Sequence, residues 1–182
     1  MGLPSVTHIL NAVGLGPDLS RVAPDVLEQA QRRGSAVHAV IEANHYGVLD
    51  PIALTPEITP YYLAYRRFVD ESQHEAIGSE IEVVHPRWGY IGHLDRVGWL
   101  RQRRGIWDWK SGEFDALAAG YQLAGYKLAW NASHPTEPVE LTAVVQLRND
   151  TTYRYHDMDA TTYEQTFLAA VVVYRALKEK AA

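Results

Sequence analysis

The sequence predicts an α/β protein in which one β-sheet is covered by helices. Apolar residues recur with helical spacing in the first 70 residues, in the middle of the chain and near its end. Between these segments, residues 79–110 and 139–156 alternate with the period of strands. The expected order is helices, a strand meander, a helix, a hairpin and a final helix, which favours a single sheet with helices packed on it.

Length and composition limit the classes of function. The 182 residues suit a single domain, residues 1–182, because domains commonly hold about 100–200 residues. The chain has no apolar run of the roughly 18 residues that a membrane span needs. It also has no cysteine, which excludes disulfides, thiol nucleophiles and cysteine-ligated zinc or iron–sulfur sites. No secretory signal is recognisable at the start, so we expect a cytoplasmic protein.

Local signals place the expected helices. Pro24 suits the first turn of a helix, and apolar spacing continues beyond Gly34, which we expect to bend or divide that helix. Thr59-Pro60 predicts an N-cap followed by a second helix through residues 61–69. The Ala- and Leu-rich residues 116–130 predict a third helix. A capping-box pattern, Thr161-x-x-Glu164, precedes the last apolar run, residues 167–177.

Five segments have the pattern of strands. They are expected at residues 79–84, 90–100, 106–110, 139–147 and 153–156. The polar and basic residues 101–105 predict the loop of the hairpin between the second and third strands. Asn149-Asp150 marks the turn of the last hairpin.

The clearest chemical signal is the pair Asp108 and Lys110. The strand period puts both on one face of a strand and Trp107 and Trp109 on the other. A rise of roughly 3.3 Å per residue places the Cα atoms of the acid and the lysine about 7 Å apart. Taken alone, such a pair is more often a surface ion pair, which contributes little to stability.

A second acid on the preceding strand changes this interpretation. A hairpin through residues 101–105 can bring Asp95 beside Asp108, and two carboxylates so close repel unless a cation lies between them. Hard divalent cations such as Mg²⁺ prefer such oxygen ligands. Glu80, one strand earlier, can add a third carboxylate. The four groups together predict a metal site with Lys110 as an additional charged group.

The acidic residues, the lysine and the motifs around them occur in an order that resembles the RecB-like branch of the PD-(D/E)XK nuclease superfamily, which includes many phage exonucleases. The resemblance covers residue 3 to about residue 130. It is carried by Gly92-x-x-Asp95, Asp108-x-Lys110, Gln122-x-x-x-Tyr126, Leu3-Pro4-Ser5-Val6-Thr7 and Arg33-Gly34-Ser35-x-Val37-His38. Leu94 replaces the proline of the family's name. The iron–sulfur cysteines of some relatives are absent, which excludes that subgroup.

The resemblance implies a restriction-endonuclease-like mixed sheet flanked by helices, with Mg²⁺ or Mn²⁺ as cofactor. The implied metal ligands are His38, Glu80, Asp95, Asp108 and the backbone carbonyl of Trp109. Lys110 would orient or activate the attacking water and stabilise the phosphorane charge, so the catalytic set is Glu80, Asp95, Asp108 and Lys110.

Two further expectations concern the edges of this site. Gln122 and Tyr126, one helical turn apart, would contact the substrate or support the site. Ser111, in the turn after Lys110, either lets the backbone approach substrate or simply makes a turn. Glu82 shares a strand face with Glu80, so which of the two faces the metal stays open, with Glu80 preferred.

The sequence therefore predicts a Mg²⁺- or Mn²⁺-dependent deoxyribonuclease, in particular an exonuclease acting on DNA ends in phage or bacterial recombination, repair or replication. The net charge of −5 at first argues against nucleic acid, but up to two divalent ions would make the site itself attract phosphate. Single- or double-stranded DNA is the expected partner, with a helicase or recombination protein as a further one, in the cytoplasm of a bacterium or of a phage's host.

Two alternatives remain at this point. One is a structure-specific endonuclease of the same fold. The other is a catalytically inactive nucleic-acid-binding subunit, against which the intact Asp95, Asp108 and Lys110 speak. Cleavage polarity, the choice of DNA or RNA, strandedness and oligomeric state stay open.

Overall fold

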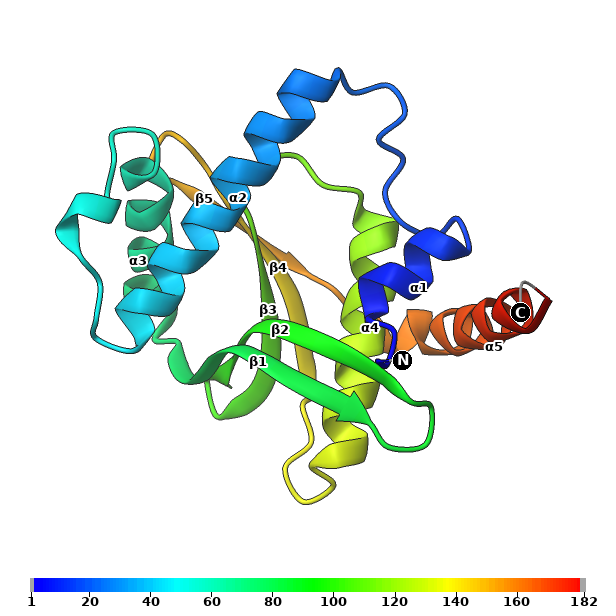
Figure 1. Ribbon diagram of the computed structural model, residues 1–182. Helices are drawn as coiled ribbons and strands as arrows, with labels where there is room; N and C mark the ends of the chain where they lie inside the picture. The colour runs from blue at the N-terminus through cyan, green and yellow to red at the C-terminus, as the bar shows by residue number, and fades with distance from the viewer. Residues whose placement is uncertain (1, 181–182) are drawn as a thin grey trace.

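A computed structural model describes residues 2–180 and contains one five-stranded mixed sheet. The strands lie in the order β1-β2-β3-β4-β5, and only β3 and β4 run parallel. Their bounds are β1 Glu75–His85, β2 Tyr90–Leu100, β3 Arg103–Lys110, β4 Leu141–Leu147 and β5 Tyr153–Asp157. With helices on both faces of the sheet, the predicted α/β class is confirmed (Figure 1).

The helices form two groups, one on each face of the sheet (Figure 1). Their bounds are α1 Val6–Ala12, α2 Pro24–His45, η1 Pro51–Ala53, α3 Thr59–Ser72, α4 Ala116–Ser133, η2 Ala160–Tyr163 and α5 Glu164–Lys180. Helices α1, α4 and α5 pack on one face, and α2 and α3 on the other. Because β3 continues into α4 and the chain then returns as β4, these two central strands run parallel.

Each face of the central strands contributes to a separate apolar core. Ile106 of β3 and Val144 of β4 are buried against α1, α4 and α5. Their neighbours Trp107 and Val145 point the other way, into the core under α2 and α3. Strands covered on both faces are expected to be almost continuously apolar, and Val144, Val145 and Trp107 are all fully buried. A buried polar side chain in these strands is therefore an exception that points to a functional role.

Several element boundaries differ from the predicted ones. The hairpin between β2 and β3 is a two-residue turn at Arg101 and Gln102, both with positive φ (49° and 67°), so the predicted loop 101–105 is too long. Gly34 does not divide α2, which is one continuous helix. The N-cap of α3 is Ile58 rather than Thr59, whose hydroxyl donates to the carbonyl of Leu54 instead.

The predicted capping box before the last helix is wrong, because Thr161 lies in η2 and Glu164 begins α5. Both side chains contact Lys127 of α4, at 2.7 Å from the Thr161 hydroxyl and 3.0 Å from the Glu164 carboxylate. The two residues therefore attach the last helix to α4 rather than capping it.

Helix α1 was not foreseen in the sequence. Ser5 caps it by accepting a hydrogen bond from the backbone of His8, and Val6, Ile9 and Leu10 are buried. A helix of seven residues has little stability of its own, and this one is stabilised by packing against α4 and α5. Within residues 2–180, no helix is both long enough and apolar enough to cross a membrane.

Candidate metal and active site

The pairing of β2 and β3 ends where the site begins. The last paired residues are Arg96 and Trp107. Beyond them the side chain of Asp95 replaces the β2 backbone, since its Oδ2 accepts the backbone N–H of Trp109 at 2.8 Å. A buried backbone donor is thereby satisfied, and the carboxylate of Asp95 is fixed between the two strands with 8% of the residue exposed.

Glu80 occupies an irregular position in β1, opposite Asp95. The paired residues Ser79 and Ile81 flank it, but its own φ is +51°. The left-handed conformation costs a residue with a side chain roughly 1–2 kcal/mol, and it breaks the alternation of strand faces. Glu82, two residues on, is exposed and lies 3.2 Å from His93. Glu80 and Glu82 therefore do not share an environment, and only Glu80 lies in the cluster with His38 and Asp95.

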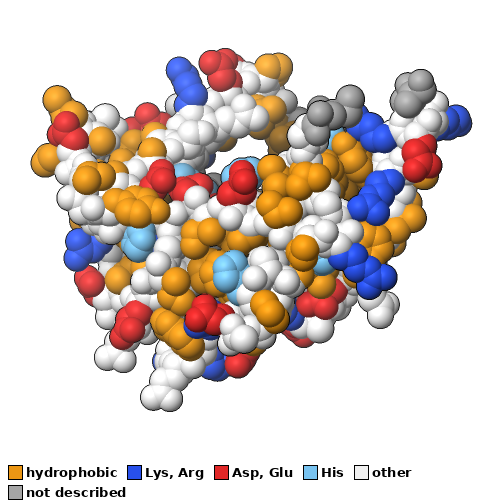
Figure 2. All heavy atoms as spheres, turned by 60° about the horizontal axis from the view of Figure 1, so that its bottom comes forward, with side chains coloured by type: hydrophobic (Ala, Val, Ile, Leu, Met, Phe, Trp, Pro, Cys, Tyr) orange, Lys and Arg blue, Asp and Glu red, His pale blue; other side chains and the backbone are white. Residues whose placement is uncertain are grey.

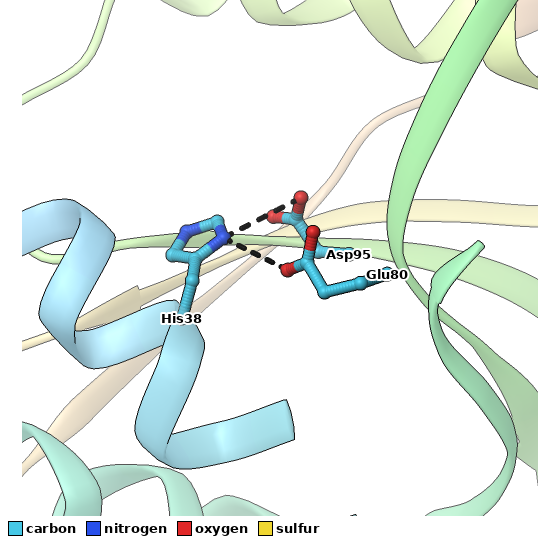
Figure 3. Close-up of side chains that lie close together, drawn as sticks. All are labelled: His38, Glu80 and Asp95. Carbon is cyan, nitrogen blue, oxygen red and sulfur yellow. Dashed lines mark hydrogen bonds and ion pairs between the residues drawn. The ribbon is translucent and has the colours of Figure 1, made fainter. Parts of the chain in front are cut away.

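His38 of α2 completes a cluster with these two acids (Figure 3). Its Nδ1 lies 3.2 Å from Oε1 of Glu80 and 3.6 Å from Oδ1 of Asp95. Its Nε2 lies 2.9 Å from the backbone carbonyl oxygen of Trp109. One ligand atom from each of the three side chains lies within 4.8 Å of the others, so this cluster could hold a metal ion.

Asp108 and Lys110 share a face of β3, as their spacing predicts. Lys110 Nζ lies 2.8 Å from Oδ2 of Asp108, while Trp107 and Trp109 are buried in the other core. Asp108 is not part of the cluster of His38, Glu80 and Asp95. The predicted meeting of three acids around one point is thus only partly found, because Lys110 attracts the third carboxylate.

The two α4 residues expected near substrate are linked to each other. Gln122 donates a hydrogen bond to the Tyr126 hydroxyl at 2.7 Å, and Tyr126 is 4% exposed. The tyrosine ring packs directly under β2, since a Cβ at Gly92 would lie only 2.8 Å from its Cδ1. Tyr126 is therefore placed to support the strand that carries Asp95. Gln122 and Ser111 are partly exposed.

Burial and charge shift the protonation of the site in a consistent direction. Burial raises the pKa of Asp95, and Asp108 adds to this effect while His38 opposes it. Burial alone would lower the pKa of His38, but Asp95, Glu80 and the Trp109 carbonyl outweigh it and raise that pKa to about 9. Burial is likewise outweighed at Lys110, whose pKa is raised by Asp108 and Asp95.

These pKa shifts show that the site has more carboxylates and hydrogen-bond acceptors than the positive charges of His38 and Lys110 balance. The carboxylates and the Trp109 carbonyl raise the pKa of His38 even though the ring is largely enclosed. Oxygen ligands together with one imidazole are a donor set that suits Mg²⁺ or Mn²⁺. The residues present therefore fit a divalent cation.

Two hollows lie at the site, one beside the cluster and one beside Lys110. One, of about 390 Å³, is lined by residues of α2 that include His38 and by Glu80 of β1. The other, of about 580 Å³, is lined by Lys110 and by residues of α1, the loop after it and the start of α4. Figure 2 shows an opening in one face of the molecule, with acidic and histidine side chains near its rim. The cluster is thus accessible from the first hollow, and Lys110 from the second.

Arg96 is a site component that sequence reasoning missed. Its side chain is fully buried, donates to the Tyr65 hydroxyl at 3.1 Å and lies 3.1 Å from Nδ1 of His45. It also lies over the ring of Trp109, 5.9 Å from the centroid. A charged residue directly after Asp95 in an otherwise apolar strand is the one signal that could have pointed to it. Arg96 joins α2, α3 and β3 behind the cluster.

Comparisons with known proteins found distant likenesses. No family model and no curated protein matches the chain. Among solved structures, the alkaline exonuclease LHK-Exo from Laribacter hongkongensis is similar at 15% identity and a TM-score of 0.38, covering 99% of this chain and 93% of that one. Its complex with dAMP gives 16% identity and a TM-score of 0.36, with the same coverage. A structure named SSO0001 is similar at 16% identity and a TM-score of 0.35, over 79% of this chain and 71% of that one.

Proposed function

We propose that the protein is a divalent-cation-dependent nuclease that hydrolyses DNA phosphodiester bonds, in particular an exonuclease acting on DNA ends. One observation carries the proposal: Asp95 of β2 accepts a hydrogen bond from the backbone of Trp109, the residue between Asp108 and Lys110, and the Lys110 ammonium group lies 2.8 Å from Asp108. Both acids are almost completely buried, and both influence the pKa of Lys110. Two such acids and a lysine next to an open groove suit the hydrolysis of a phosphodiester.

His38, Glu80, Asp95 and the carbonyl of Trp109 would hold the cation, with Asp108 as a further ligand. When bound, the cation supplies Lewis-acid stabilisation of the charge that develops on the phosphate oxygens. The strands fix these ligands before substrate arrives, because the backbone of Trp109 is bound by Asp95 on its N–H and by His38 on its carbonyl.

Lys110 acts on the reacting groups in this proposal. Its ammonium group donates hydrogen bonds to a phosphate oxygen and orients the attacking water, while Asp108 fixes its position. Because Asp108 and Asp95 raise its pKa, Lys110 remains a proton donor at neutral pH. Gln122 borders the same groove and is proposed to contact the substrate strand, and Tyr126 to support β2 from below.

The proposed setting is DNA recombination, repair or replication in the cytoplasm, with a helicase or recombination protein as partner. Cation-dependent cleavage of DNA can be tested with the purified protein alone. End-labelled single- and double-stranded DNA, incubated with and without Mg²⁺ or Mn²⁺, should be shortened only when the cation is present. Products released one nucleotide at a time would support an exonuclease, and their label would give the polarity.

Variants distinguish this activity from a contaminant. Lys110→Ala should fold and lose roughly 10²–10³-fold of the cleavage rate, as expected for removal of one donor to the transition state. Glu82→Gln is the matched control, because Glu82 is exposed and pairs with His93 outside the cluster. Undiminished cleavage by the purified Lys110→Ala protein would refute the proposal.

A further inference from the structure

The chain between α1 and the middle of α2 forms an arch, which we define as residues 13–33. It consists of the loop 13–23 and the first ten residues of α2 (Figure 1). None of these residues is buried, and the buried side chains of α2 begin only at Val37. This half of the helix therefore does not rest on either core, whereas the loop before it lines the groove beside Lys110 with residues 16–19.

Both ends of the arch are anchored on the sheet. At the first end, the backbone of Ile91 in β2 donates to the carbonyl of Pro4 at 2.9 Å, and α1 is buried against α4 and α5. At the second end, His38 contacts the carbonyl of Trp109, and the Tyr46 hydroxyl donates to that of Ser79 in β1. The chain thus leaves the sheet at β2, passes over the site and returns at β1 and β3.

The arch is also closed against the turn that follows Lys110. A Cβ at Gly112 would lie 3.3 Å from Nη2 of Arg33, and a Cβ at Gly34 would lie 3.9 Å from Oγ of Ser111. From this turn the chain runs into α4, which packs against α1. The arch, the turn, the start of α4 and helix α1 therefore form a continuous ring of protein, and the groove that contains Lys110 lies beside it.

The size and lining of the groove select the form of the substrate. A volume of about 580 Å³ lies within the ~300–1,000 Å³ of sites that hold one small ligand, too little for a duplex. Leu10, Pro17, Leu19 and Phe114 give it apolar walls, which suit the faces of unpaired bases. Acidic residues also border it, and they disfavour the doubled phosphate density of a duplex.

We propose that the substrate strand is threaded beneath the arch, unpaired and with its free end first, to reach Lys110. This inference rests on the proposed nuclease function and adds the reason why an end is required. A strand without a free end cannot enter a closed ring unless the arch opens. Arg33, whose Nε is buried without a hydrogen-bond partner among residues 2–180, is placed at the closure to contact a phosphate of the strand.

A trapping experiment tests threading without depending on cleavage. A single-stranded oligonucleotide with biotin at both ends is bound to the Asp108→Asn protein in Mn²⁺, and streptavidin is added either before or after the protein. Threading predicts no complex when the ends are blocked first, and a complex that resists high salt when they are blocked afterwards. A complex that forms on pre-blocked strands, or that dissociates in salt with both ends blocked, would overturn the proposal.

The matched control opens the ring. A protease site inserted between Ser20 and Arg21, in the exposed part of the loop, leaves both anchors of the arch in place. Cutting at this site should release the trapped strand, whereas the uncut insertion variant should retain it. Retention after complete cutting would show that the arch does not enclose the strand.

Circular substrate separates failure of threading from failure of the nuclease proposal. The unaltered protein should degrade a linear single strand and leave the covalently closed circle of the same sequence intact. Degradation of both at similar rates would leave the nuclease standing and refute threading. Absence of both cleavage and binding for either form would refute the proposed function as well.

Discussion

At the scale of single residues, the site depends on side chains in unusual conformations and close contacts. Glu80 and Glu82 are two residues apart in the same strand, yet only Glu80 has positive φ and lies 3.2 Å from His38. The strained conformation is the physical reason for their different surroundings. Strain of this kind persists where the surrounding structure enforces it, and it is frequent at functional sites.

This difference gives a paired prediction for metal binding. Glu80→Gln should weaken Mn²⁺ binding by roughly 10–100-fold or more. Replacing a residue that only hydrogen-bonds to a metal ligand typically has an effect of that size, and Glu80 is proposed as a direct ligand. Glu82→Gln should leave the affinity unchanged, since Glu82 contacts His93 outside the cluster. Isothermal titration calorimetry measures both. Equal affinities for the two variants would contradict the assignment of Glu80.

Gly92 provides a second prediction at this scale. A Cβ there would meet Cδ1 of Tyr126 at 2.8 Å, and the ring cannot move freely because its hydroxyl is held by Gln122. Gly92→Ala should therefore lower the free energy of unfolding by about 1–3 kcal/mol, the usual cost of overpacking a core. Chemical denaturation measures it. Gly2→Ala is the control, because open space surrounds that position and the substitution should change little.

At the scale of elements, the site forms where regular structure stops. The ladder between β2 and β3 ends at Arg96 and Trp107, and the freed backbone of Trp109 is taken over by Asp95 and His38. The sequence predicted both ends of β2 and the two faces of β3 correctly, because hydrophobic alternation determines them. It could not predict the contacts of the buried Arg96 with Tyr65 and His45, because these depend on how separate elements meet.

Helix α2 offers a prediction at the element scale. Since it is continuous, Gly34 costs helix stability without a conformational need for glycine, and a Cβ there would meet Ser111 only at an ordinary 3.9 Å. Gly34→Ala should raise the free energy of unfolding by roughly 0.5–1 kcal/mol. Thermal or chemical denaturation tests this. A loss of stability would show that a Cβ at position 34 lies closer to the 111–112 turn than 3.9 Å.

At the scale of the whole molecule, two cores lie on opposite faces of one sheet, and the cluster lies between α2 and strands β1 and β2. The order of helical and strand patterns along the chain made a sheet covered by helices predictable, and both faces of β3 and β4 are apolar. The short helix α1 and the arch were not predictable, since their positions depend on packing and on anchor contacts distant in sequence. The general location of the site followed from Asp95, Asp108 and Lys110, whereas its enclosure did not.

Acid stability of the whole fold should depend on His74. Its ring is buried against Phe68 and Trp107, and burial together with the charge of Arg96 lowers its pKa to about 3. Between pH 6.5 and about 3 the unfolded chain binds a proton at this residue that the folded chain does not. The fold should therefore lose stability as the pH falls below 6.5, by up to about 1.4 kcal/mol per pH unit from this group.

The comparison with His74→Leu isolates that contribution. The difference in unfolding free energy between the two proteins should be constant above pH 7 and should shift in favour of the variant as the pH falls to 5. Denaturation at several pH values measures it. A difference that stays constant down to pH 5 would show that His74 titrates normally in the folded protein.

The central claim is that one divalent cation binds between α2, β1 and β2. Anomalous diffraction from a crystal grown with Mn²⁺ tests it most directly, because the signal locates the metal without any assumption about activity. The account predicts a peak in contact with His38, Glu80 and Asp95 and with the carbonyl oxygen of Trp109. A fully occupied Mn²⁺ elsewhere, with no peak among these four groups, would contradict it.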